Sequence, residues 1–118
     1  MKGLIILAHG SKVASTNEML EKILAEVTNR VEFDHVEGAY LQLMDPSLDM
    51  AIDIMDKKKI TDITVFPMFL FKGNHIREDI PEEINKILAV KPHLNIKFLE
   101  NIGYDDKLVD IIAERVSL

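Results

Sequence analysis

The sequence predicts an α/β fold of the flavodoxin-like kind: a parallel four-stranded sheet in the order 2-1-3-4 with helices on both faces. Four short apolar runs rich in Ile, Val, Leu and Phe alternate with four stretches whose apolar residues recur at helical spacing. Repeated strand–helix units with right-handed crossovers give a parallel sheet covered by helices on both faces. The 118 residues, 47% hydrophobic and 29% charged, fit one domain over residues 1–118.

The four strands are expected at about 3–8, 36–41, 63–70 and 94–99. The third of these is apolar on both faces, as a central parallel strand should be. Pro67 removes one backbone donor from it, so we expect a bend or a strand end there.

All four helices have an apolar stripe, and three of them have a candidate start. Ser15, with an acidic residue three positions later, suits a capping box, and Asp45 suits the cap of the second helix, with Pro46 as its first residue. The third helix is expected to begin with Asp79 and Pro81, after a loop over 71–78. The residues expected to face inward are, in chain order, Leu20, Ile23, Leu24, Val27 and Val31; Leu48, Ile52 and Met55; Ile80, Ile84, Ile87 and Leu88; and Leu108, Ile111, Ile112 and Val116.

Composition excludes several functions. With 20 acidic against 14 basic residues, the formal charge of −6 argues against a general nucleic-acid binder. The chain has no Cys, so any metal must be held by His, carboxylate or backbone oxygen. No apolar run approaches the roughly 20 residues of a membrane span, and residues 1–8 are too short a run for a signal peptide. We therefore expect a cytoplasmic protein without a membrane or nucleic-acid partner.

Two histidines occupy the place where this fold binds ligands. In the order 2-1-3-4 the winding reverses between the first and third strands, and the loops that follow those strands flank a crevice. His9 begins one of these loops and His75 lies in the other. An imidazole there can bind a divalent metal, accept a proton near neutral pH, or simply hydrogen-bond to backbone. His35 and His93 lie at the opposite strand ends, where loops usually serve stability.

Common alternatives lack their motifs. The first turn, at 9–12, is neither a dinucleotide fingerprint nor a phosphate-binding P-loop. The third strand lacks the acceptor Asp of a receiver domain, and no Gly-x-Ser-x-Gly elbow supports a hydrolase.

Three motifs resemble the small CbiX-type class II chelatases: His-Gly-Ser at 9–11, Asp-Pro-Ser-Leu at 45–48, and the block at 67–81 that contains P-x-F-L-x-x-G-x-H-x-x-x-D-I-P with its first Pro at 67. The resemblance covers essentially the whole chain. It implies insertion of a divalent metal (Co²⁺ first, with Ni²⁺ or Fe²⁺ as alternatives) into sirohydrochlorin, in cobalamin, sirohaem or F430-type biosynthesis. It also implies that His9 and His75 are the catalytic metal ligands, that the protein is a homodimer, and that the metal is a substrate, with no tightly bound cofactor.

The chain departs from this pattern at Gln42, where many relatives have Glu, and it lacks a His-rich insertion before the last strand. The second departure favours cobalt or iron over nickel. Basic residues of the cleft loops suit a polycarboxylate substrate, and aromatic residues suit its flat ring. The expected substrate-binding residues are Ser11, Lys12, Tyr40, Gln42, Phe71, Lys72, Gly73, Asn74 and Arg77. The alternative function is a non-catalytic carrier of metal or tetrapyrrole.

Overall fold

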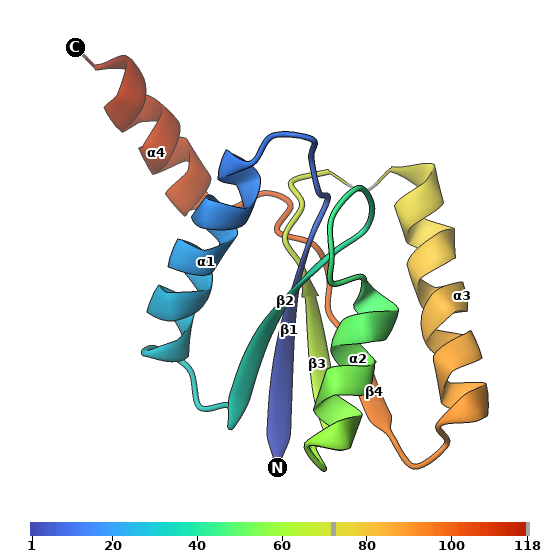
Figure 1. Cartoon of the computed structure of the whole chain (residues 1–118). Helices are drawn as coiled ribbons and strands as arrows, with labels where there is room; N and C mark the ends of the chain where they lie inside the picture. The colour runs from blue at the N-terminus through green and yellow to red at the C-terminus, as the bar shows by residue number, and fades with distance from the viewer. Residues whose placement is uncertain (72, 118) are drawn as a thin grey trace.

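The computed structural model describes residues 1–71 and 73–117, and the side chains of residues 74–77 lie outside this description. The elements follow in the order β1 (Lys2–Ala8), α1 (Ser15–Thr28), β2 (His35–Tyr40), α2 (Leu48–Lys57), β3 (Asp62–Pro67), α3 (Asn74–Val90), β4 (Asn95–Phe98) and α4 (Asp106–Val116). The strands form one sheet in the order β2-β1-β3-β4, with every pair parallel, and the predicted fold is confirmed (Figure 1). Among the described residues, no helix is long and apolar enough to cross a membrane.

Strand β1 lies between β2 and β3, and it pairs with both of them up to its last two residues. Ala8 lies opposite Tyr40 in β2, and Leu7 lies opposite Pro67 in β3. Strand β3 ends at Pro67, as expected for a residue that cannot donate to a neighbouring strand. Strands β1, β2 and β3 therefore end at nearly the same level.

The two faces of the sheet have separate cores. Helices α2 and α3 cover one face, where Ile5, Leu7, Ile52, Met55 and Ile63 are among the fully buried residues. Helix α1 covers part of the other face, where Leu20 packs with residues of β1 and with Tyr40 (Figure 1). The predicted inward stripes of the first three helices are confirmed by this packing.

Both helix caps predicted from the sequence, at Ser15 and Asp45, are wrong. The cap position of α1 is Ala14, which has no side-chain acceptor, and Ser15 is already helical. Helix α2 is capped by Ser47, whose hydroxyl accepts a hydrogen bond from the backbone N–H of Met50 at 3.2 Å, in place of Asp45. Ser and Asp are comparable caps, so local sequence cannot choose between positions two residues apart.

Helix α3 begins five residues earlier than predicted, at Asn74 and not at Asp79, and it contains Pro81 in its interior. Proline removes one hydrogen bond from a helix and usually ends it. Here Ile80, Ile84 and Ile87 are buried against the sheet, and this packing on both sides of the proline holds the helix together. The helix therefore carries His75 in its first turn, where a loop was expected.

Helix α4 is the largest disagreement with the sequence prediction. Leu108, Ile111, Ile112 and Val116 were expected to face the core, yet within 106–116, all of which the structure describes, no residue is buried. Figure 1 shows α4 extending away from the sheet beyond the first turn of α1. Helical periodicity predicts an amphipathic helix and does not specify which surface covers it.

At the opposite end of the sheet, charged side chains join α2 to the segment before β4. The Lys91 ammonium contacts the carboxylates of Asp53 at 2.9 Å and Asp56 at 3.1 Å, and His93 Nε2 lies 2.6 Å from Asp56. Hydrogen bonds from Lys91 and Lys57 lower the pKa of Asp53, and those from His93 and Lys91 lower the pKa of Asp56.

These lowered pKa values predict a loss of stability in acid. A carboxyl whose pKa is lower in the folded chain stabilises it above the unfolded pKa, which is 3.8 for both residues, and that contribution disappears as the pH falls through the lower folded value. The urea midpoint, followed by circular dichroism, should therefore fall between about pH 4 and pH 2. Asp56→Asn should reduce this dependence and Asp110→Asn, on exposed α4, should not; equal slopes in all three proteins would contradict the prediction.

Candidate functional site

The loops that follow β1, β2 and β3 converge at one edge of the sheet, beside the first turn of α3 (Figure 1). Backbone hydrogen bonds hold these loops together. The N–H of Leu41 donates to the carbonyl of Ala8 at 2.9 Å, and that of Gln42 donates to the carbonyl of His9 at 3.2 Å. On the other side, the N–H of Met68 donates to the carbonyl of Leu7 at 2.8 Å. Side chains from three distant parts of the sequence thus share one edge.

His9 is exposed at this edge, and its imidazole packs on the ring of Phe69. The two ring centroids are 4.4 Å apart, with the planes tilted by 49°. Phe69 is only 4% exposed, so it is a fixed support under the imidazole. Such packing limits the orientations of His9 while leaving its ring accessible, which suits an imidazole that binds a metal ion or takes up a proton.

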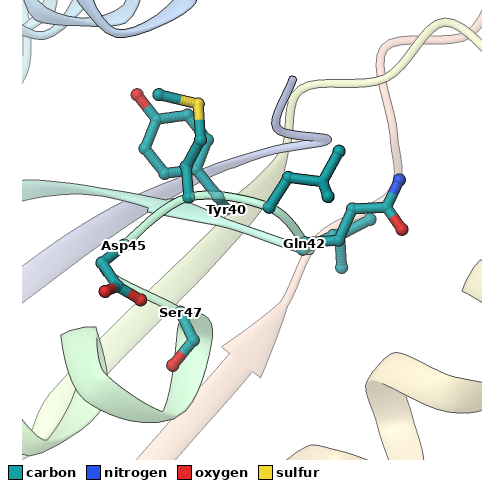
Figure 2. A pocket seen from close by; sticks show the side chains of 7 residues that line it. Tyr40, Gln42, Asp45 and Ser47 are labelled. Carbon is teal, nitrogen blue, oxygen red and sulfur yellow. The ribbon is translucent and has the colours of Figure 1, made fainter. Parts of the chain in front are cut away.

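The loop after β2 lies directly against Gly10. This glycine has a φ of +91°, and a Cβ atom added to it would overlap the carbonyl oxygen of Gln42. Gly10 therefore permits both the turn and the close approach of the two loops. Figure 2 shows that loop around a pocket of about 310 Å³, which is lined by residues 40–45 and Ser47.

Tyr40 and Gln42 play different parts in this loop. Tyr40 is 2% exposed and donates a hydrogen bond through its hydroxyl to Asn17 of α1 at 3.0 Å. Burial, and then the charge of Glu21, raise the pKa of the Tyr40 hydroxyl. The Gln42 side chain is exposed and extends away from Tyr40 (Figure 2). The structure thus places Tyr40 in the core under the loop and Gln42 on its surface.

The remaining candidate residues lie in the loops after β1 and β3. The Ser11 hydroxyl accepts a hydrogen bond from the N–H of Val13 at 2.9 Å and so shapes its own turn. Lys12 is exposed, and Phe71 is 83% exposed, an unusual state for a large aromatic ring. Gly73 is exposed at the cap position of α3.

Four candidates fall wholly or partly outside the described structure. Lys72 lies outside the described residues, as do the side chains of Asn74, His75 and Arg77. The backbone of the last three residues forms the first turn of α3. First-turn N–H groups have no acceptor within the helix and carry a positive partial charge, so this end of α3 favours anionic groups.

The other two histidines are on the opposite edge, as expected. His35 Nε2 lies 2.7 Å from the Glu37 carboxylate, and His93 is paired with Asp56. Among the described side chains, no group of three or more His, Asp or Glu residues is arranged to hold a metal ion.

Sequence reasoning missed two supporting residues, Asn17 and Asn101. Asn17 accepts the hydrogen bond from Tyr40, and the Asn101 amide donates to the carbonyl of Leu70 at 3.1 Å. Each partner is more than 20 positions away along the chain, and no local motif signals such a contact.

The close approach at Gly10 predicts a large effect of Gly10→Ala. The left-handed backbone alone costs a non-glycine residue about 1–3 kcal/mol, and the overlap with Gln42 adds to this. Gly73→Ala is the matched control, because its φ is −76° and its added Cβ meets no atom of the described residues within 4 Å; we expect a loss below about 1 kcal/mol there. Urea unfolding of both variants measures the difference, and similar losses would refute this account of Gly10.

Comparison with known proteins agrees with this architecture. The CbiX family profile matches residues 3–118. The chain is 30% identical over 118 residues to the sirohydrochlorin cobaltochelatase of Sulfurisphaera tokodaii, covering 98% of this chain and 92% of that protein. It is 26% identical over 117 residues to the sirohydrochlorin ferrochelatase of Priestia megaterium, covering 99% of this chain but 44% of that protein. The chain thus spans less than half the length of the second relative.

Solved structures show the same similarity. A CbiX protein described as a putative cobalamin biosynthesis protein, from Marinobacter aquaeolei, superimposes with a TM-score of 0.81 at 32% identity, covering 98% of this chain and 94% of that one. The sirohydrochlorin chelatase SirB from Bacillus subtilis subspecies spizizenii, in complex with cobalt, gives a TM-score of 0.89 at 26% identity, covering 97% of this chain and 49% of that one. Because the family profile spans nearly the entire sequence, this chain belongs to the CbiX family.

Proposed function

We propose that this protein is a sirohydrochlorin chelatase that inserts a divalent metal, Co²⁺ in preference to Fe²⁺ or Ni²⁺, into the tetrapyrrole. The observation that carries this proposal is the CbiX match over residues 3–118, in a chain whose fold places His9 on Phe69 at the edge where α3 begins. A relative of similar length, from Sulfurisphaera tokodaii, is a cobaltochelatase, which supports the preference for cobalt.

In this proposal His9 and His75 bind the incoming metal. The two residues follow neighbouring strands, β1 and β3, and approach the same edge along the backbone. Neutral imidazoles suit late first-row divalent metals, and two protein ligands leave open positions for transfer. A site that collects metal for insertion must also release it, and a fully enclosed set of ligands would prevent that.

The tetrapyrrole carries several carboxylates, and the chain is acidic overall, so local charge has to attract it. Lys12, Lys72 and Arg77 lie in or next to the two cleft loops, together with the N-terminal end of α3. Charges more than about 8 Å apart are largely screened at physiological salt, so the cations of these loops act on a bound carboxylate more strongly than the acidic residues at the opposite end of the sheet. Phe71, 83% exposed, offers an apolar surface for the flat ring.

Metal insertion also requires two pyrrole N–H protons to leave. Gln42 cannot accept a proton, because its side chain is a neutral amide. We assign the uptake of one of these protons to His9, or to His75, once the metal has moved to the ring, and water accepts the other. Holding metal and ring in register supplies much of the rate, since aligned intramolecular reactions gain about 7–11 kcal/mol over bimolecular ones.

The proposal includes a homodimer acting in the cytoplasm. Two copies of this chain approximate one molecule of the longer relatives, of which a single copy covers 44% in one case and 49% in another. A site built between two copies would offer a larger and flatter surface to a tetrapyrrole than one domain of this size.

The function is tested by anaerobic incubation with sirohydrochlorin and Co²⁺, followed by the absorption change of the ring. His9→Ala and His75→Ala should each lower the insertion rate by more than about 100-fold, because even outer-shell partners of metal ligands cost 10–100-fold. His35→Ala, on the opposite edge, is the control and should retain the wild-type rate.

Two outcomes would contradict the proposal. If the wild-type protein binds metal or tetrapyrrole without exceeding the uncatalysed rate, the protein is a carrier. If His75→Ala turns over normally, His75 is not part of the site.

A further inference from the structure

Strand β3 loses its pairing with β4 before it reaches the edge of the candidate site. The last pair between the two strands joins Val65 to Phe98, whereas β3 pairs with β1 up to Pro67. The next residues, 68–71, lead toward the first turn of α3, and none of these four described residues belongs to a strand. Contacts other than strand pairing therefore fix the position of this segment.

The linker between β4 and α4, residues 99–105, supplies such contacts. The Asn101 side-chain amide donates to the carbonyl of Leu70 at 3.1 Å and to that of Phe69 at 3.4 Å. The N–H of Ile102 also donates to the Phe69 carbonyl, at 2.9 Å. An amide group carries two N–H donors, so one asparagine side chain can bond two successive carbonyl oxygens. Three hydrogen bonds thus tie residues 69 and 70 to the linker.

Both histidines of the candidate site depend on the backbone that Asn101 holds. The His9 ring packs on the ring of Phe69, with the two centroids 4.4 Å apart. Phe69 is buried, and a closely packed ring keeps its place relative to its own backbone. From residue 70 a short segment leads to the first turn of α3, which contains His75. The held backbone therefore lies between the support of one histidine and the start of the helix that carries the other.

We propose that Asn101 is a positioning residue: its amide holds residues 69 and 70 so that His9 and His75 can reach one metal ion. This rests on the proposed function, which assigns the metal to these two histidines. The Asn101 amide nitrogen is not a ligand in this account, because it is engaged as a donor to carbonyl oxygens. Ligands carried by loops need supporting hydrogen bonds of this kind, since loops place side chains less precisely than helices and strands do.

The chain offers a matched control for this hydrogen bond. Leucine has nearly the shape of asparagine but no donor, so Asn101→Leu removes the bonds to both carbonyls with little change in side-chain size. Asn95 lies at the start of β4, and its amide donates to the Asp62 carboxylate at 3.2 Å. Asn95→Leu therefore removes a comparable side-chain hydrogen bond at the opposite end of the sheet.

Calorimetric titration with Co²⁺, without tetrapyrrole, tests the proposal. Asn101→Leu should raise the dissociation constant for Co²⁺ about tenfold or more, because losing an outer-shell partner of a metal ligand costs about 10–100-fold in affinity. Asn101→Gln keeps an amide donor one carbon further from the backbone, and it should bind Co²⁺ more tightly than Asn101→Leu. Asn95→Leu should bind Co²⁺ as the wild type does.

The histidine ring signals of a proton NMR spectrum give a second readout that needs no metal. The ring current of Phe69 shifts the signals of the His9 ring, which are identified by their absence from the spectrum of His9→Ala. In Asn101→Leu these signals should move toward the position of an exposed histidine, while those of His35 and His93 stay in place. A general loss of stability would not single out His9. Asn101→Ala has the same expected result and decides the question if the leucine variant does not fold.

Wild-type affinity for Co²⁺ in Asn101→Leu, or His9 signals that do not move, would overturn the proposal. An equal loss of affinity in Asn95→Leu would also overturn it, because the effect would then reflect stability alone. The proposed function is scored separately, by metal insertion into sirohydrochlorin. A wild type that binds Co²⁺ through His9 and His75 without inserting it would remove the chelatase and leave the role of Asn101 standing.

Discussion

Pairing of β1 with β2 on one side and β3 on the other is the constraint on which the rest of the molecule depends. The register places Ala8 opposite Tyr40 and Leu7 opposite Pro67, so that three loops leave the sheet at one level. Neighbouring strands are only about 4.8 Å apart, and loops that start so close together must share space. On the β2 side of β1, Gly10 makes this close approach possible, because the carbonyl oxygen of Gln42 lies where a Cβ atom of residue 10 would be.

Phe69 is the second point at which separate parts of the molecule meet. Its buried ring supports the exposed imidazole of His9, and its carbonyl accepts from Ile102 in the linker before α4. A change in the position of α4 therefore acts on the same residue that orients His9.

The sequence predicted the fold because its signals are local and repeated. Apolar runs and helical stripes predicted all eight elements, and the reversal of winding predicted the edge at which His9 lies.

The features that the sequence could not predict depend on contacts between distant residues. Pro81 by itself predicts the end of a helix. In the structure α3 continues past it, because Ile80 and Ile84 are packed in the core. The stripe on α4 predicted a buried helix, but periodicity contains no information about whether the covering surface belongs to the same chain. Tyr40 lines the pocket of the loop after β2, and its hydrogen bond to Asn17, 23 positions away, is a contact that no local pattern signals.

The central claim is that one metal ion is shared by imidazoles from the loop after β1 and the first turn of α3. Anomalous diffraction at the cobalt edge, from crystals soaked in Co²⁺, tests it most directly. The account predicts an anomalous peak within bonding distance of ring nitrogens of both His9 and His75, about 2.0–2.2 Å from each. Cobalt bound at the opposite edge, beside His35 or His93, with no peak between His9 and His75, would contradict it.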